Sequence, residues 1–387
     1  MKVVILMTKE KIIAICQENY EEIVAIRREL HQCPEIGRKE YKTTEVIIDR
    51  LEKWGISYER LVDTGVVATV KGDKSGVTTA LRADIDALGI TENTDVPFKS
   101  RNGCMHACGH DIHTASLLGA AKIINENKDK LAGTVKFIFQ PDEEGDGGAE
   151  RLIEKGAMDG VDRVFGLHVR PEMKAGTLAV RYGKFYAASD IFEIDVIGKA
   201  GHCAEPHKNV DAIVIGAQII TALQTLVSRN VSPLDSAVLT IGTANGGTFR
   251  NTVAGKFSIT GVTRSLGQEM RMYLRQRIKD TAEGIAKAMG GEAVVRIIES
   301  YPGIVNDDTS AGYIEKTARD ILGEDKVSVL TEPFMTTEDF GYYLNEAPGC
   351  FYHIGCESDY PLHSDKFCPD ERAILTAMIM HIASIFG

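Results

Sequence analysis

A chain of 387 residues is too long for one ordinary hydrophobic core, so we expect two domains. Its 44% hydrophobic and 26% charged residues are typical of a soluble globular protein. The net charge of −11 argues against a nucleic-acid partner, because phosphate binding needs a basic face. The apolar run VVILM at 3–7 is far too short for a membrane span or a signal peptide. We therefore expect no membrane partner and a cytoplasmic protein.

Cysteine usage agrees with this location. The eight cysteines, at 16, 33, 104, 108, 203, 350, 356 and 368, are scattered along a large chain. That pattern suits reduced thiols in a cytosolic enzyme better than a disulfide framework. None forms a CxxC pair, so structural zinc ribbons and thioredoxin-type sites are not indicated.

The first third of the chain alternates helical and strand patterns. Apolar spacing predicts helices at 9–31, at 41–54 and from Asp111 onward, and strands at 65–70, 78–84, 134–140 and 162–169. Continuous apolar strands separated by helices predict a largely parallel sheet covered on both faces.

A second pattern begins near residue 185. Residues 190–198 alternate apolar and polar side chains, as in a half-exposed strand, and Asn209 is expected to cap a long apolar helix. Strands near 236–243, 254–264 and 292–300 and a helix ending at Gly290 complete a small α+β sandwich. The fold class is therefore predicted as α/β, with a mostly parallel sheet flanked by helices. Its catalytic domain comprises 1–185 and 303–387 and is interrupted by an inserted α+β domain at 186–302.

The stretch CMHACGHDIH at 104–113 concentrates side chains that bind metals or move protons. Cys108 and His110 lie two apart, so an extended backbone at Gly109 lets them converge just before a helix. Asp111 is expected to cap that helix, and His113 to face elsewhere, one turn in. The stretch alone leaves three readings open: a metal site, a thiol nucleophile with its base, or a hydrogen-bonded polar loop.

Acidic and imidazole side chains recur where predicted strands end, which is where ligands gather in open α/β sheets. Glu143 and Glu144 follow one strand, and adjacent residues there point in opposite directions, so one can bind a metal while the other faces a reacting water. His168 ends the next strand. Other candidates are Asp84, Asp86, Asp339 and His363; the aspartates Asp84 and Asp86 suit either metal binding or the orientation of a ligating imidazole.

Eight segments in order along the chain resemble one family closely. They are RRELHQCPEIG at 27–37, LRADIDAL at 81–88, MHACGHDIHTA at 105–115, FIFQPDEEGDGGA at 137–149, FGLHV at 165–169, KAGHCAEPH at 199–207, TTEDFG at 336–341 and PLHSDKF at 361–367. The chain resembles the amidohydrolase branch of the aminoacylase and carboxypeptidase G metallopeptidase family. That branch includes indole-3-acetyl-amino-acid hydrolases, hippurate hydrolases and N-acetyl-diaminopimelate deacetylases.

The resemblance implies a zinc-peptidase-like catalytic domain with two divalent metal ions. By matching position the metal ligands are Cys108, His110, Glu144, His168 and His363. Glu143 is implied as the general base, Asp86 as a residue that orients a ligand, and Asp84 as either a ligand or a support. Such a mixed donor set suits Mn²⁺ or Zn²⁺, with Co²⁺ or Ni²⁺ as alternatives.

The inserted domain is implied to complete the site in a homodimer. His202 resembles the family histidine that reaches into a neighbouring subunit's site and stabilises the oxyanion, and Asn251 and Arg264 resemble residues that hold a substrate carboxylate. The expected reaction is cleavage of the amide bond of an N-acyl amino acid or short peptide by a metal-bound water. A metallo-dipeptidase or carboxypeptidase is the nearest alternative. A cysteine-nucleophile hydrolase and a non-catalytic metal-binding protein are alternatives of other classes.

Overall fold

The computed structural model describes residues 7–386, so nearly all of the apolar run at 3–7 lies outside the described residues. The described chain divides into two compact units. The first extends to Gly183 and includes Asn306–Thr331 and the chain from Asp339 onward; the second comprises Lys184–Val305 and Glu332–Glu338. The second unit therefore includes 332–338, a segment distant in sequence from the rest of it. That segment joins the second unit because Phe334 stacks on Tyr186 and donates its N–H to the carbonyl of Phe185.

The first unit is built on an eight-stranded sheet of order β1-β2-β4-β3-β5-β16-β6-β15. Its strands are β1 (Ser57–Arg60), β2 (Val66–Lys71), β3 (Lys74–Asp84), β4 (Ala132–Gln140), β5 (Arg163–Arg170), β6 (Leu178–Val180), β15 (Val327–Val329) and β16 (Gly349–Gly355). The four central strands β4, β3, β5 and β16 are parallel to one another, as the sequence predicted. Strands β1 and β2 add an antiparallel edge.

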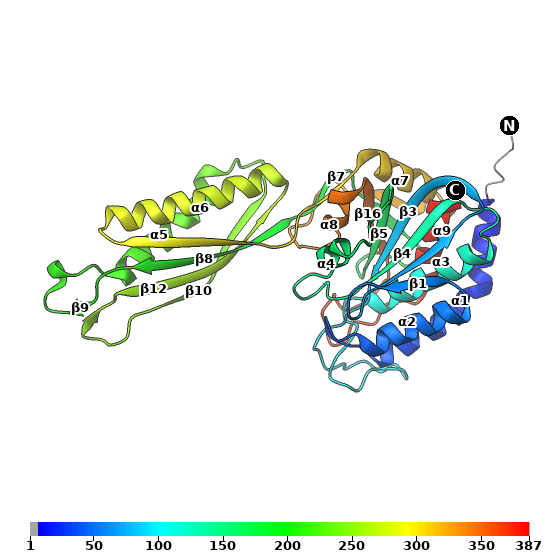
Figure 1. Cartoon of the computed structure of the whole chain (residues 1–387), viewed down its shortest axis with the longest axis horizontal. Coiled ribbons are helices and arrows are strands. Elements are labelled where there is room, and N and C mark those ends of the chain that lie inside the picture. Colours follow the sequence, from blue (N-terminus) through cyan, green and yellow to red (C-terminus); the bar gives the residue numbers. More distant parts are fainter. Residues whose placement is uncertain (1–6, 387) are drawn as a thin grey trace. The chain divides into compact units, whose positions relative to one another are not determined.

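Helices cover this sheet (Figure 1). They are α1 (Lys9–Gln32), α2 (Tyr41–Lys53), α3 (His110–Glu126), α4 (Ala149–Glu154), α7 (Asp308–Leu322), α8 (Gly341–Glu346) and α9 (Arg372–Phe386). Helices α1, α3 and α9 pack against one another, and α4 packs against α8. Residues Phe137 to Gln140 at the end of β4 are all buried, because both faces of the strand are covered.

The second unit pairs a four-stranded antiparallel sheet with two helices (Figure 1). The sheet order is β10-β12-β8-β13, with β8 (Ala188–Ile197), β10 (Ala237–Gly246), β12 (Lys256–Ser265) and β13 (Glu292–Glu299), and the helices are α5 (Ala212–Thr225) and α6 (Gln268–Ala288). Alternate residues of β8, namely Phe192, Ile194 and Val196, are buried under α5 and α6. A short ladder joins β9 (Gly201–His202) to β11 (Thr252–Val253). The chain passes between the units within β7 (Gly183–Tyr186) and β14 (Ile304–Asn306).

The start of α5 corrects one prediction. Asp211, and not Asn209, caps this helix, because the Asp211 carboxylate accepts the N–H groups of Ile213 and Val214. The Asn209 side chain instead donates to the carbonyl of Glu205. By length and composition the stretch Ala212–Asn230 is the one described helix apolar enough to cross a membrane, and only a third of that window is buried.

Candidate metal centre

Three neighbouring parallel strands deliver side chains to one edge of the sheet. Asp84 ends β3 and lies in register with Gln140 at the end of β4, and β5, which carries His168, pairs with β3 on its other side. Asp86 follows β3, and Glu143 and Glu144 follow β4. Residues distant in sequence therefore gather at the carboxyl ends of the strands.

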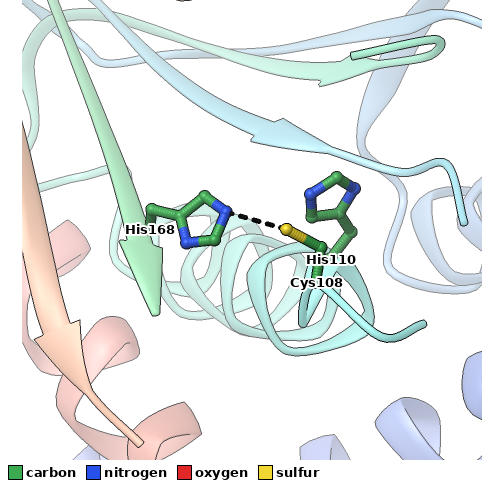
Figure 2. A group of neighbouring side chains, drawn as sticks. All are labelled: Cys108, His110 and His168. Atoms are coloured by element: carbon green, nitrogen blue, oxygen red, sulfur yellow. Dashed lines mark hydrogen bonds between the residues drawn. The ribbon is translucent and has the colours of Figure 1, made fainter. Parts of the chain in front are cut away.

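Gly109 lets Cys108 and His110 approach the same point. Its φ is +88°, a left-handed conformation that glycine adopts without strain, and an added Cβ would overlap the side chain of Val169. His110 is the first residue of α3. Figure 2 shows the Cys108 thiol directed at His168, with Sγ 3.3 Å from Nε2. Both side chains are buried.

The imidazole of His110 has one nitrogen engaged and one available. Its Nδ1 lies 3.0 Å from the carbonyl oxygen and 3.1 Å from the carboxylate of Asp86, which fixes the proton on Nδ1. Its Nε2 makes no hydrogen bond among the described residues and lies 3.7 Å from the buried Asp84 carboxylate. When this nitrogen is deprotonated, its lone pair can bind a metal ion.

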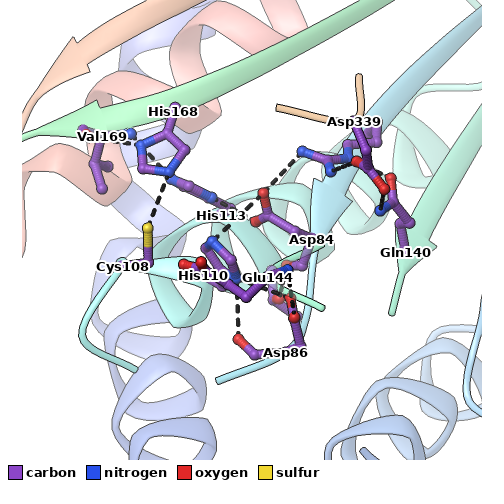
Figure 3. Close-up of polar contacts among 12 residues, drawn as sticks. Asp84, Asp86, Cys108, His110, His113, Gln140, Glu144, His168, Val169 and Asp339 are labelled. Carbon is purple, nitrogen blue, oxygen red and sulfur yellow. Dashed lines mark hydrogen bonds and ion pairs between the residues drawn. The ribbon is translucent and has the colours of Figure 1, made fainter. Parts of the chain in front are cut away.

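Asp86 also fixes the second ligand segment. Its other carboxylate oxygen accepts the backbone N–H of Glu144 at 3.0 Å (Figure 3). The Glu144 carboxylate lies 2.9 Å from Nε2 of His363. His363 has a φ of +64° and donates its own N–H to the carbonyl of Ala107, next to Cys108. The C-terminal loop is thereby fastened to the segment that carries the thiol.

The five predicted ligands form two overlapping groups. Cys108, His110 and His168 make one group and Cys108, Glu144 and His363 the other, with the ligand atoms of each group within 4.8 Å of one another. Glu143 is buried and forms a third group with His110 and Glu144. Sulfur, imidazole nitrogen and carboxylate oxygen together fit a borderline divalent cation such as Zn²⁺ or Mn²⁺. The residues present thus fit a two-metal centre.

The local charges favour a cation. Burial alone would lower the pKa of His110, but the carboxylates of Asp84, Asp86 and Glu144 raise it to about 10. Burial, followed by the charges of Glu144 and Glu143, raises the pKa of the Cys108 thiol well above its ordinary value. Burial also lowers the pKa of His168, which keeps that imidazole neutral and able to donate a lone pair. The excess negative charge is what a divalent ion would neutralise.

The sequence analysis expected His113 to face away from the other candidate side chains, and the structure shows that it does not. Its ring lies 4.7 Å from that of His168, and its Nδ1 is 2.6 Å from Asp84 (Figure 3). Its Nε2 accepts the N–H of Val169 at 3.0 Å. Both nitrogens are therefore occupied, although His113, His110 and Asp84 are close enough to form a ligand group. His113 and Asp84 therefore lie beside the predicted ligands His110 and His168.

Arg82 was not predicted as part of this site. It is buried in β3 and donates to Asp84, to Gln140 and to Asp339, each at 2.8 Å. The Asp339 carboxylate also accepts the backbone N–H groups of Gly148 and Ala149, just before and at the start of α4. The available signal was the spacing of Arg82 and Asp84, which lie two apart and so share one side of a strand.

Asp111 does not cap α3. Gly109 occupies the cap position, and Asp111 lies in the first turn, where its Oδ1 accepts the N–H of Ile112 at 3.0 Å. Its buried Oδ2 pairs with Arg27 at 2.7 Å and with His31 at 2.8 Å. Arg27 and His31 are four apart on α1, so they lie on the same side of that helix. The segment RRELH thus anchors α3 directly behind the predicted ligand His110.

The three remaining predicted residues belong to the second unit. His202 in β9 pairs with Thr252, and the next N–H, from Cys203, donates to the carbonyl of Asn251, so His202 and Asn251 are neighbours. Arg264 lies on β12, where it donates to the Ser189 hydroxyl at 2.6 Å. No described hydrogen bond or ion pair joins Arg264 to a carboxylate.

The fold and this donor set define a class: a hydrolase built around a metal site at the edge of a parallel sheet. The model of the peptidase family M20/M25/M40 matches residues 80–384. N-acetyl-L-cysteine deacetylase of Bacillus subtilis is 42% identical over 92% of this chain and 86% of its own length. Thermostable carboxypeptidase 1 of Saccharolobus solfataricus is 38% identical over 96% of both chains.

Solved structures agree. The chain matches the YXEP protein of Bacillus subtilis, a dinuclear metal binding peptidase from the M20 family, with a TM-score of 0.84 and 34% identity over 95% of this chain and 98% of that one. It also matches an aminohydrolase from methicillin resistant Staphylococcus aureus with a TM-score of 0.94 and 35% identity over 98% and 100% of the two chains. This chain therefore belongs to the peptidase family M20/M25/M40, and it is an aminoacylase-like amide hydrolase.

Proposed function

We propose that the protein cleaves the amide bond of N-acyl amino acids with two divalent metal ions per subunit. The observation that carries this proposal is the pair of ligand groups that share Cys108, with the buried Glu143 beside them. A protein that only stores metal has no need of a further carboxylate at that position. Mn²⁺ and Zn²⁺ are the metals proposed first, with Co²⁺ and Ni²⁺ as alternatives.

When bound, the metal pair would polarise the amide carbonyl and make a water molecule more acidic. Glu143 accepts the proton of the attacking water and returns it to the nitrogen of the leaving amine. The metals are held by Cys108, His110, Glu144, His168 and His363. Asp86 orients two of these ligands, because it contacts the Nδ1 of His110 and accepts the N–H of Glu144. Glu143 therefore moves the proton in each step, while the neighbouring Glu144 stays in place as a ligand.

Substrate binding is assigned to the second unit. We propose that His202, supplied by the other subunit of a dimer, donates to the oxyanion, and that Asn251 and Arg264 hold the substrate carboxylate. The half-buried Arg264 supports this role, since burial lowers the pKa of its guanidinium and no described carboxylate neutralises it. An incoming carboxylate would do so.

Relatives point to the substrate class. Their names include N-acetyl-L-cysteine deacetylase and N-acetyldiaminopimelate deacetylase, both of which act on an acylated amino acid. A metallo-dipeptidase or carboxypeptidase is the second candidate, favoured by the carboxypeptidase of Saccharolobus solfataricus. Both reactions break an amide bond beside a carboxylate, so the same centre serves either.

A cysteine-nucleophile mechanism is disfavoured by the surroundings of the thiol. A nucleophilic cysteine needs a lowered pKa, usually from a neighbouring cation. Burial and two nearby glutamates raise the pKa of Cys108 instead. Cys108 is therefore better suited to bind a metal than to attack a carbonyl.

We also propose a homodimer in the cytoplasm. No charged side chain lies between Ala212 and Ser228, in α5 and the turn that follows it, and α5 exposes Ile213 and Val214. Strand β10 lies at the edge of its sheet, beside this helix. An uncharged helix face next to an open strand edge suits association with a second copy. Light scattering of the wild type and of Ala217→Glu tests it: the dimer mass is expected only for the wild type, and a monomeric wild type would refute the proposal.

The function is tested by an activity screen. Metal-depleted enzyme is reloaded with Mn²⁺ or Zn²⁺ and assayed against N-acetyl amino acids, N-benzoyl amino acids and dipeptides. We expect metal-dependent hydrolysis that is faster for the acyl amino acids. Faster dipeptide cleavage would select the second candidate, and activity that survives chelation but not thiol alkylation would select the cysteine mechanism.

A further inference from the structure

The residue immediately before the Glu143-Glu144 pair has an unusual backbone. Asp142 has a φ of +60°, the left-handed region that residues with side chains rarely adopt. Its side chain is buried. Strain of this kind persists only where the surroundings hold it, and it concentrates at functional sites.

Two arginines bind the Asp142 carboxylate. Oδ2 accepts from Nε of Arg38 at 2.9 Å and from Nη2 of Arg151 at 2.7 Å. Arg38 comes from the loop between α1 and α2, and Arg151 from α4. The carboxylate therefore ties the loop that carries the proposed base to two other segments of the chain.

Two glycines make room for the other carboxylate oxygen. At Gly37 and at Gly145 an added Cβ would overlap Asp142 Oδ1. The carboxylate thus occupies a space that exists because both neighbours lack side chains. A smaller residue at 142 would leave that space unfilled and the arginines without their shared partner.

The backbone of this loop is fixed at both ends. The N–H of Asp142 donates to Oε1 of the buried Glu40 at 2.9 Å, and Glu40 Oε2 accepts from the hydroxyl of Thr64 at 2.8 Å. Two residues later, the N–H of Glu144 donates to Asp86. Glu143 lies between these two fixed amides.

We propose that Asp142 is a positioning residue: its carboxylate, clamped by Arg38 and Arg151 between Gly37 and Gly145, holds the loop in the left-handed turn that aims Glu143 at the reacting water. This role rests on the proposed function of Glu143. It predicts that losing the clamp slows the chemical step while Glu144, held by Asp86 and His363, keeps its metal. Displacement of a catalytic group by about 1 Å costs on the order of a hundredfold in rate.

Three variants at one position test the clamp. Asp142→Asn keeps an oxygen acceptor and tolerates the left-handed turn, Asp142→Gly keeps only the turn, and Asp142→Ala keeps neither. Asp146→Asn is the matched control, because the exposed Asp146 carboxylate also contacts Arg38, at 3.0 Å. Metal content, kcat, KM and amide hydrogen exchange of the segment 141–149 are measured on the metal-loaded proteins.

We expect kcat to fall at least about tenfold for the alanine and glycine variants, with two metals per chain and KM nearly unchanged. The asparagine variant and the Asp146 control should stay within about threefold of the wild type, and exchange in 141–149 should quicken only in the alanine and glycine variants. A glycine variant as active as the wild type would overturn the proposal, because backbone freedom alone would then suffice. Metal loss in parallel with activity would also overturn it.

The experiment also distinguishes a variant that does not fold and a wild type that has no activity from a failure of the clamp. Should the alanine variant not fold, Arg151→Met removes the same contact from the other side, and unchanged kcat and exchange there would overturn the clamp. If the wild type hydrolyses no N-acyl amino acid or dipeptide, the proposed function fails. Hydrogen exchange is then the measurement that tests the clamp. Equal exchange in the wild type and the glycine variant would refute the clamp.

Discussion

His113 and Asp84 form a buried hydrogen bond at the end of β3, with 2.6 Å between Nδ1 and Oδ1. The other nitrogen of His113 accepts the N–H of Val169, the residue after His168. The imidazole is thereby fixed in one neutral tautomer and joins the strand end of β3 to that of β5. His113 therefore holds the strand end beside the proposed ligand His168 and has no free lone pair of its own.

His113→Ala is therefore expected to destabilise the protein without removing a metal. It leaves the Val169 N–H and one Asp84 oxygen buried and unpaired, which costs roughly 1–3 kcal/mol for each group. Urea unfolding and elemental analysis of the same preparation check this. A variant that lost one metal per chain at unchanged stability would make His113 a ligand instead.

Cys108→Ser should weaken metal retention at least about tenfold, because a hydroxyl replaces the thiolate shared by both ligand groups. Metal content after dialysis against a weak chelator measures the effect. Cys104→Ser is the control from the same stretch and should retain metal like the wild type. Equal retention by both variants would remove Cys108 from the ligand set.

His202→Ala should lower kcat by about a hundredfold or more, as loss of an oxyanion donor does, while metal content stays the same. His207→Ala alters a second exposed histidine five residues along and serves as the control. An unaltered kcat in His202→Ala would leave it an ordinary surface histidine in a short strand.

Stability should depend on pH through Glu40. Burial raises the pKa of Glu40 from 4.5 to about 7 in the folded protein. Between these values the folded protein holds a proton that the unfolded chain has released, so the contribution of Glu40 to the free energy of unfolding declines as pH rises from 4.5 to 7. The decline is at most about 3 kcal/mol.

Glu40→Gln removes this titration and keeps an oxygen to accept the N–H of Asp142. The difference between its free energy of unfolding and that of the wild type should therefore shift in favour of the variant as pH rises from 4.5 to 7. Denaturation curves of both proteins at several pH values provide the comparison, and parallel pH profiles would contradict the assignment.

The secondary-structure elements, and the clustering of the candidate side chains, were predictable where sequence pattern and structure share one cause. Buried parallel strands read as continuous apolar runs, so the polar residue that ends such a run marks the edge of the sheet, as Gln140 does at the end of β4. Gly109 was informative because its conformation and its contact with Val169 both require glycine. These features depend on local sequence and on the general behaviour of α/β sheets.

The supporting residues were harder to predict because each depends on partners far along the chain. Arg82 joins β3 to Asp339, and Arg27 joins α1 to the start of α3. Asp142 looked like part of an acidic turn, and nothing local signals its left-handed backbone or its two arginine partners. The segment 332–338 has no periodic pattern that assigns it to the second unit.

The central claim is that Glu143 moves the proton in a reaction at a metal centre that it does not itself hold. Glu143→Gln keeps the size of the side chain and removes its basicity, and Glu150→Gln on the exposed side of α4 is the control. The direct measurement is kcat and metal content of both variants on the best acyl amino acid. We predict a loss in kcat of roughly a hundredfold to ten-thousandfold with two metals retained in Glu143→Gln, and no change in Glu150→Gln. Near-normal turnover in Glu143→Gln would contradict the account.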